Sequence, residues 1–590
     1  MSQPVKHQPF REHLGVLTTP EIIAKSAEKH SDQIAYRIWR GEDYFAISYT
    51  EVYDQVKRLA AGLIELGIAP GDHISILGEN RPEWAIAYLA IHTAGAVAVP
   101  LDSLWSAKEW RHVIDDASVK MVIVSGRFVA DIEGIAQELE SLEWVITMEE
   151  EDSSDDSMLA SVADGENAGT APMRLVMSDP VGMEFPEVTL DDMAAIIYTS
   201  GTTGQSKGVM LSQRNICSNV AAGYQCVEYD ESDTFLSILP LHHTFECTCG
   251  FLIALYGGAS TTYARSFKSR DIIDDIKNTS VTVMLGMPLL FEKMYQGINR
   301  VLASAPLGKR ALIGGLSTAR KVGSVFGKDL SKGLFKPIRE KAGMGTVRSF
   351  MSGGAALPQN VAEGFNNMGL TLFQGYGLTE MSPITHVNRP GIIHHGSVGP
   401  PITGVEHKIV NPNDEGHGEI CVRGPNMMVG YYKNDAATAE VIDEDGWFHT
   451  GDIGVIDELD RLHISGRIKN MIVNEGGKNI YPEEIEYYIN QSPWILESLV
   501  HGRPLPGTTS EGVEVIVIPD VEYFDQQREE SGEQYLEDDI ERIVKDEYRA
   551  AVADLASYKR PKEMAIRHEE FEKTSTRKIK RFLYKLEAKT

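Results

Sequence analysis

Apolar residues recur at helical and strand spacings early in the chain. Between residues 51 and 66 the apolar positions follow a helical period, and Gly67 stands where a helix C-cap is expected. A short apolar run at Ile74–Leu77 predicts a strand, Pro82 opens a second helical stretch, and Ala96–Val99 predicts another strand. Helices that alternate with strands indicate an α/β layer architecture with a largely parallel sheet.

The length of the chain predicts more than one domain. A chain of 590 residues exceeds what one core supports, so we expect a large compound domain and at least one smaller domain. Around residues 463–486 a predicted strand leads through Gly466 into a compact α/β segment. We therefore predict a large N-terminal domain of α/β layers over residues 1–465 and a small α+β C-terminal domain over residues 466–590.

Composition narrows the class of protein. Hydrophobic residues make up 42% and charged residues 24% of the chain, as in ordinary soluble proteins. A net charge of −29 argues against a nucleic-acid partner, because such binding depends on clustered cations. The five cysteines form no pair of CxxC spacings, so we expect buried, reduced thiols. The N-terminus has no apolar signal region, and the most apolar run, Ala85–Leu101, contains Pro100 and is too short for a membrane span. We expect a cytoplasmic protein.

Two segments depart from this average charge. Residues 148–157 carry six acidic side chains and predict a solvated loop or insertion. Between Arg300 and Lys341, ten basic residues against Asp329 and Glu340 give a local charge of +8. This basic segment is compatible with peripheral contact with the inner face of an anionic membrane. It is equally compatible with a solvated surface near a bound polyanion.

The stretch YTSGTTGQSKGVMLS, Tyr198–Ser212, has the residues of a phosphate-binding loop. It is not a P-loop, because Lys207 is followed by Gly208 and not by a hydroxyl residue. The apolar runs on either side predict a strand, a loop and a second strand, with helical periodicity only past Ser212. Glycines turn backbone N–H groups toward an anion, hydroxyls add donors, and Lys207 adds a positive charge. The loop is therefore predicted to bind a polyphosphate.

This loop resembles the signature loop of the acyl-adenylate-forming superfamily, which includes acyl-CoA synthetases, luciferases and peptide-synthetase adenylation domains. In that family the loop closes over the β- and γ-phosphates of ATP; many members have Pro where this chain has Ser206. Further motifs follow in the family's order over roughly residues 20–585. The resemblance implies an ATP-binding role for Thr199, Ser200, Gly201, Thr202, Thr203, Gly204 and Lys207.

SGGAALP, Ser352–Pro358, and FQGYGLTE, Phe373–Glu380, resemble the family's adenine-binding pair. The implied adenine-site residues are Gly353, Gly354, Ala355, Gln374, Gly375, Tyr376 and Gly377. Thr379 and Glu380 would take part in catalysis, and the carboxylate of Glu380 would bind Mg²⁺, which prefers oxygen ligands. HTGD and the later GR are similar to the ribose-binding elements, which implies that Asp452 and Arg467 hold the ribose hydroxyls.

The remaining motifs imply the acyl, hinge and thiol sites. LPLHHTFE resembles the family element beside the acyl pocket, with His243 in the pocket wall. EKTSTRKIKR resembles the motif of the adenylation lysine, assigned to Lys578 with Lys580 as the competing choice; Arg577 stands where the family has Gly. Lys469 matches the hinge at which family members swing a mobile C-terminal domain. That rotation would bring Gly476, Gly477 and Lys478 toward CoA.

The implied activity is an AMP-forming acid–CoA ligase that uses ATP, Mg²⁺, CoA and a small-molecule carboxylic acid. The segment 300–341 and the motif PLHHTFECTCGF resemble long-chain fatty-acyl-CoA synthetases, which favours medium- to long-chain fatty acids. The alternatives are an aryl- or short-chain-acid CoA ligase, a ligase that loads a carrier protein, and a non-catalytic AMP-sensing relative. The sequence indicates no oligomeric state.

Overall fold

The computed structural model describes residues 15–149, 169–199, 206–227, 229–303, 335–474, 478–505, 510–532, 534–574 and 578–584. The chain forms two compact units. We call residues 1–406 with 423–448 the large unit, and residues 407–422 with 449–590 the small unit. The predicted boundary between residues 465 and 466 separates a large domain from a mobile small domain. The division into two compact units does not test which part moves, so this boundary stays a prediction.

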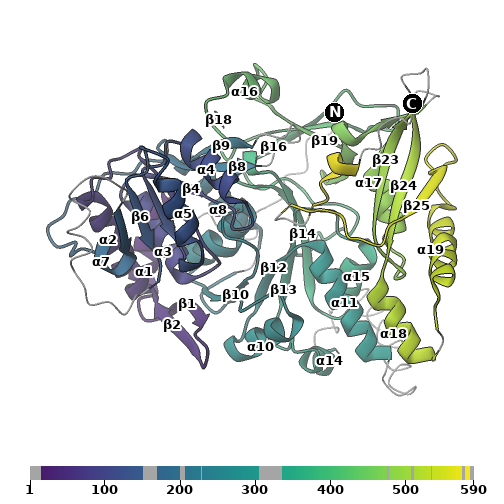
Figure 1. The fold of residues 1–590 in the computed structure, drawn as a ribbon, viewed down its shortest axis with the longest axis horizontal. Coiled ribbons are helices and arrows are strands. Elements are labelled where there is room, and N and C mark those ends of the chain that lie inside the picture. Colours follow the sequence, from purple (N-terminus) through teal and green to yellow (C-terminus); the bar gives the residue numbers. More distant parts are fainter. Residues whose placement is uncertain are drawn as a thin grey trace. The chain divides into compact units, whose positions relative to one another are not determined.

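Among the residues described, the large unit builds two eight-stranded sheets (Figure 1). The first has the order β15 (Ile384–Val387), β14 (Thr371–Gly377), β13 (Ser349–Ser352), β12 (Val283–Gly286), β10 (Thr234–Ser237), β11 (Ser260–Tyr263), β1 (Ile34–Trp39) and β2 (Tyr44–Ser48). The second has the order β18 (Gly430–Tyr431), β9 (Lys207–Ser212), β8 (Met193–Thr199), β4 (Val97–Pro100), β3 (His73–Leu77), β5 (Met121–Val124), β6 (Trp144–Thr147) and β7 (Gly169–Pro172). Both sheets are parallel in their interior and antiparallel only toward an edge, as the sequence predicted.

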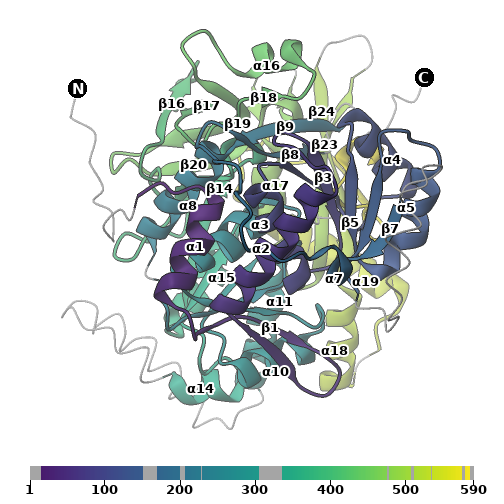
Figure 2. The ribbon, with the colours of Figure 1, turned by 90° about the vertical axis from the view of Figure 1, so that its left-hand side faces the viewer.

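The helices of the large unit connect and cover these strands. They are α1 (Thr19–Lys29), α2 (Tyr49–Glu65), α3 (Pro82–Thr93), α4 (Ala107–Asp116), α5 (Val129–Ala136), α7 (Met173–Val176), α8 (Gln213–Cys226), α9 (Ile253–Tyr256), α10 (Ser269–Thr279), α11 (Pro288–Ala303), α14 (Lys336–Lys341), α15 (Gln359–Asn367) and α16 (Asp435–Val441), with short 3-10 turns η1 (Gly126–Phe128) and η4 (Thr379–Met381) and a π-helix η3 (Phe245–Leu252). Figure 2 shows α1, α2 and α3 side by side. Helix α3 is apolar all round because it contacts β3 and β4 of one sheet and β1 of the other.

The small unit combines helices with mostly antiparallel strand pairs, and β24 and β25 pair in parallel. Its larger sheet has the order β16 (Glu406–Val410), β17 (Gly418–Arg423), β19 (Phe448–Ile456) and β20 (Leu462–Arg467). The other elements are β21 (Ile472–Val473), β22 (Asn479–Ile480), β23 (Ile495–Pro504), β24 (Glu511–Pro519), β25 (Glu563–Ile566), α17 (Pro482–Ile489), α18 (Val521–Ser531), α19 (Glu537–Val552), η5 (Ile468–Asn470) and η6 (Arg581–Tyr584). Ile485 of α17, Val515 of β24 and Val544 of α19 share one buried core, so the helices cover the β23–β24–β25 sheet.

Several local predictions are confirmed. The helix predicted over residues 51–66 is α2, and Gly67 after it has a φ of +89°. Strands β8 and β9 pair antiparallel, and α8 starts after Ser212, whose hydroxyl accepts a hydrogen bond from the N–H of Asn215. All five cysteines are buried, and none of them forms a disulfide.

The two predicted charged segments lie partly outside the described residues. The acidic segment lies outside the described residues from position 150 onward, and the basic segment lies outside them from 304 to 334. No helix of the described chain is long and apolar enough to cross a membrane.

Candidate functional site

The glycine-rich loop is the connection between two paired strands. Thr199 at the end of β8 lies opposite Lys207 at the start of β9, so the strand pairing brings the two ends of the loop together. Ser200, Gly201, Thr202, Thr203 and Gly204 lie outside the described residues. The pairing leaves Lys207 at the mouth of the loop, partly exposed, where an ammonium group can meet an anion.

A tyrosine connects this lysine with the predicted magnesium ligand. Strand β18 pairs with β9 and sets Tyr431 opposite Val209. The Nζ atom of Lys207 lies 4.8 Å from the centroid of the Tyr431 ring. The Tyr431 hydroxyl donates a hydrogen bond of 2.9 Å to Oε1 of Glu380. One phenol therefore contacts both a cation suited to phosphate and a carboxylate suited to a metal ion.

The state of the Tyr431 hydroxyl follows from its surroundings. Burial raises the pKa of Tyr431 well above its usual range, and the negative charge of Glu380 raises it further. The phenol thus keeps its proton and acts as a donor to the carboxylate. Tyr431 was not among the residues picked out by sequence, because a Gly–Tyr pair has no signal of its own; the pairing of β18 with β9 reveals it.

Glu380 fits the requirements of a magnesium ligand. It lies in η4, partly exposed, and its backbone oxygen accepts a hydrogen bond of 2.8 Å from the N–H of Met428. Within the described part of the chain, its second carboxylate oxygen, Oε2, accepts no hydrogen bond. Mg²⁺ is commonly bound by one or two carboxylates together with substrate phosphates and water, so a single oriented carboxylate is a suitable donor set.

The two predicted adenine segments lie at the carboxyl-end edge of the first sheet, where the neighbouring strands β13 and β14 end. Strands β13 and β14 are parallel neighbours with Ser352 opposite Gln374, so the residues that follow each strand are brought together. A Cβ atom at Gly377 would lie 1.9 Å from the carbonyl oxygen of Pro383, which excludes a side chain there. Gly354 has a φ of +82°, a conformation that favours glycine.

The exposure of this edge suits a flat ligand. Gln374, Gly375 and Tyr376 are partly buried, while Gly354, Ala355 and Gly377 are exposed. Gly353 is buried under the ring of Phe245. The Tyr376 ring lies 6.1 Å from the ring of His386, so one face of the tyrosine is supported from within the fold.

The predicted ribose pair is present in the small unit. Antiparallel pairing of β19 and β20 places Asp452 opposite Arg467. The Nε atom of Arg467 donates a hydrogen bond of 2.6 Å to Oδ1 of Asp452. Asp452 is 6% exposed and Arg467 is exposed, so the arginine holds a buried carboxylate in place.

The predicted hinge and thiol-site residues lie on the surface of the small unit. Lys469 is exposed in η5. Lys478 is exposed, and its N–H donates a hydrogen bond of 2.9 Å to Oδ1 of Asn474. Gly476 and Gly477 lie outside the described residues.

The predicted adenylation lysine is hydrogen-bonded to Thr574. The N–H of Thr574 donates a hydrogen bond of 2.8 Å to the carbonyl oxygen of Lys578, whose own N–H donates one of 3.2 Å to the Thr574 hydroxyl. Lys578 is exposed, whereas the competing Lys580 is partly buried. Arg577, the departure from the family pattern, lies outside the described residues.

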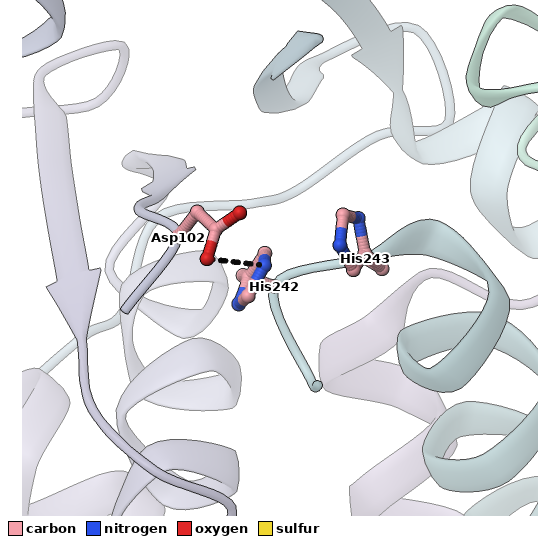
Figure 3. Close-up of side chains that lie close together, drawn as sticks. All are labelled: Asp102, His242 and His243. Carbon is pink, nitrogen blue, oxygen red and sulfur yellow. Dashed lines mark ion pairs between the residues drawn. The ribbon is translucent and has the colours of Figure 1, made fainter. Parts of the chain in front are cut away.

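His243 lies in the segment that follows β10. It is partly buried, and its ring centroid is 4.3 Å from that of the buried His242. Figure 3 shows both rings near the carboxylate of Asp102, which comes from the segment after β4. The assignment of His243 to an acyl pocket stays a prediction.

Known proteins resemble the chain along most of its length. A long-chain-fatty-acid–CoA ligase of Rattus norvegicus, ACSBG2, is 30% identical over 84% of this chain and 76% of its own length. Long-chain-fatty-acid–CoA ligase 5 of the same organism is 33% identical over 79% of this chain and 70% of its own. The crystal structure of ATP-bound MatB from Rhodopseudomonas palustris has a TM-score of 0.73 at 26% identity and covers 96% of this chain and 98% of its own.

The family model described as "AMP-binding enzyme" matches residues 23–432, which include the glycine-rich loop, both adenine segments, Glu380 and Tyr431. This match extends over well more than half of the chain. The protein belongs to the AMP-binding enzyme family.

Proposed function

We propose that the protein is an AMP-forming acyl-CoA synthetase that activates medium- to long-chain fatty acids. A carboxylate oxygen attacks the α-phosphorus of ATP, and the bond to pyrophosphate breaks to leave an acyl-AMP. The sulfur of CoA then attacks the acyl carbon, and AMP leaves. A carboxylic acid is already ionised at neutral pH, so the first step needs positioning and charge neutralisation more than a general base.

The contact of one tyrosine with Lys207 and Glu380 carries this proposal. The arrangement sets an ammonium group and a metal-binding carboxylate on a common support at the mouth of the glycine-rich loop. Pyrophosphate as a leaving group requires such charge stabilisation. A non-catalytic protein that only bound adenine would need the residues at the ends of β13 and β14. It would need neither the Lys207 ammonium group nor the Glu380 carboxylate.

Each of the other groups has a role that its surroundings support. The edge formed by Gly353, Gly354, Ala355 and residues 374–377 would hold adenine, with Tyr376 against the purine face. The oriented carboxylate of Asp452 would accept the ribose hydroxyls. The exposed Lys578 would bind the attacking carboxylate and the α-phosphate. Glu380 would hold Mg²⁺, which would supply Lewis-acid neutralisation of the phosphate charge.

The fatty-acid assignment is supported by the relatives. Both rat proteins are long-chain-fatty-acid–CoA ligases and exceed or equal 30% identity. In this chain Leu239, Leu241 and Phe251, from the segment that would border the acyl group, are buried apolar side chains. Such surroundings favour an aliphatic chain over a charged substrate.

ATP–pyrophosphate exchange with a panel of carboxylic acids tests the proposed function. We expect exchange with octanoate to palmitate, little with acetate or benzoate, and conversion to the CoA thioester when CoA is added. Exchange without thioester would indicate a carrier-loading ligase, and exchange only with aromatic or short acids would remove the fatty-acid assignment. Absence of exchange with every acid would contradict the proposal as a whole.

A single-lysine variant tests the division of labour between the half-reactions. Lys578→Ala is expected to slow acyl-AMP formation by roughly 10²–10³-fold, because one preorganised charge on the transition state is lost. Thioester formation from supplied acyl-AMP should change little. Lys580→Ala is the matched control. Equal loss of both half-reactions, or a larger effect at Lys580, would contradict the assignment.

The basic segment 300–341 is proposed to contact anionic membranes, where fatty acids partition. Cosedimentation with phosphatidylserine vesicles at low salt tests this. Binding that is unchanged when the segment's charges are reversed would show that the membrane contact lies elsewhere.

A further inference from the structure

Asp102, His242 and His243 form a compact cluster of side chains (Figure 3). Asp102 follows β4 of one sheet, and the histidines follow β10 of the other. Each side chain offers one ligand atom, and these three atoms lie within 4.8 Å of one another. We propose that this cluster binds a tetrahedral divalent transition-metal ion of the Zn²⁺ class. The proposal rests on the geometry of this cluster and not on the acyl-CoA synthetase assignment, which places His243 in the wall of the acyl pocket.

The distance between the buried pair fits a shared ion better than a direct bond. Nε2 of His242 lies 3.4 Å from Oδ1 of Asp102, and these side chains are 6% and 4% exposed. Nε2 of His242 has no hydrogen-bond partner among the residues that the structure describes. Two donors that each lie about 2.1 Å from a tetrahedral zinc ion are roughly 3.4 Å apart. A buried polar atom without a partner is costly, and a metal ion would satisfy it.

The supporting contacts hold the ligands in place. Oδ1 of Asp102 accepts a hydrogen bond of 2.9 Å from the N–H of Leu104, and its backbone oxygen accepts one of 2.8 Å from Nε1 of Trp110. The segment before the histidines is fixed by Asn80, whose side chain bonds to the carbonyl of Leu239 and to the N–H of Leu241. Such outer contacts orient metal ligands in proteins.

The donor set selects the kind of ion. Two imidazoles and one carboxylate suit Zn²⁺ and related ions, whereas Mg²⁺ prefers oxygen ligands alone. His243 is only partly buried, so the cluster is accessible on the side of this histidine, where an ion and a fourth ligand can enter.

A second cluster of similar composition provides a comparison. Glu419, Cys421 and His449 of the small unit also place three ligand atoms within 4.8 Å. There, however, Nδ1 of His449 already shares a hydrogen bond of 2.9 Å with Glu419, and the other Glu419 oxygen accepts one of 3.2 Å from the N–H of Gly451. These atoms are satisfied by the protein, so Cys421→Ser serves as the matched control.

Equilibrium dialysis of the full chain against Zn²⁺ alone, after treatment with a chelator, tests the proposal. We expect saturable binding that weakens at least tenfold in Asp102→Asn and in His242→Gln, and that persists in Cys421→Ser. Asp102→Asn keeps an oxygen for the Leu104 N–H, and metal-free melting of each variant checks folding. Should both variants fold poorly, Co²⁺ added to the wild type should give tetrahedral d–d bands without thiolate charge transfer. No saturable Zn²⁺ binding, unchanged binding in both variants, or thiolate bands as the sole signal would overturn the proposal.

Discussion

Glu380 and Glu246 are two glutamates of the large unit in opposite surroundings. Glu380 lies partly exposed in η4, where the Tyr431 hydroxyl donates to one of its carboxylate oxygens. Glu246 lies in the π-helix η3 and is 0% exposed. Neither of its carboxylate oxygens makes a hydrogen bond of normal geometry with the described side chains and backbone, although the Ser237 hydroxyl lies near them.

The difference decides what each carboxyl group can do. Burial raises the pKa of Glu246 to about 8, and this effect outweighs the opposing influence of the Ser237 hydroxyl. Glu246 is thus a neutral acid of the core at neutral pH, whereas the oxygens of Glu380 are oriented and open to a cation. The same residue type is thus fully buried at one position and oriented by a phenol at a partly exposed position.

The largest expected effect comes from removing the charge of the accessible carboxylate. Glu380→Gln keeps the shape and one acceptor for Tyr431 but loses the negative ligand for Mg²⁺, so we expect ATP–pyrophosphate exchange to fall by roughly 10³-fold. The exposed Glu363 of α15 gives the control, Glu363→Gln. Wild-type exchange in Glu380→Gln at every Mg²⁺ concentration would contradict the proposed role.

The same substitution at the buried glutamate should change stability and its pH dependence. Because the folded-state pKa of Glu246 is raised to about 8 from 4.5, the folded protein holds a proton that the unfolded chain releases. Its contribution is favourable below pH 4.5 and is lost as the pH rises through about 8. Removing this group in Glu246→Gln should raise stability relative to the wild type progressively from pH 5 to pH 8, by roughly 3 kcal/mol in total.

Urea unfolding followed by tryptophan fluorescence measures this difference. Six of the seven tryptophans lie in the large unit, so the signal reports mainly on the unit that contains Glu246. The difference between variant and wild type should grow with pH, while Glu363→Gln should run parallel to the wild type. A constant difference across the range would show that Glu246 does not titrate there.

The sequence predicted the layers and the strand, loop, strand arrangement well, for a physical reason. Apolar periodicity reports which face of an element is buried, and the elements around Pro82 and Ser212 carry strong cap signals. The type of fold and the family were also predictable from the motifs and their order. These motifs contain glycines, such as Gly377, that close backbone contact requires.

Contacts between elements distant in sequence were not predictable. Tyr431 meets Glu380 across 51 positions, and Asp102 lies beside His242 only because the ends of β4 and β10 come together. The burial of Glu246 was equally hidden, since the motif that contains it reads the same whether its glutamate faces a ligand or the core. Local patterns record the environment of an element and not the partner of a side chain.

Removing the Tyr431 hydroxyl weakens the contact that distinguishes Glu380 from Glu246, and we expect a small effect. Tyr431→Phe keeps the ring beneath Lys207 but removes the hydroxyl that donates to Glu380. One hydrogen bond to a charged group is worth about 1.5 kcal/mol, so the Mg²⁺ concentration for half-maximal exchange should rise roughly tenfold. The maximal rate at saturating Mg²⁺ should fall less, because the carboxylate itself is still present. Tyr432→Phe, one position along the chain, is the control, since Lys433 lies over that ring without linking it to the site. If both variants shift the Mg²⁺ dependence equally, the hydroxyl of Tyr431 does not position Glu380, and exposure alone separates the two glutamates.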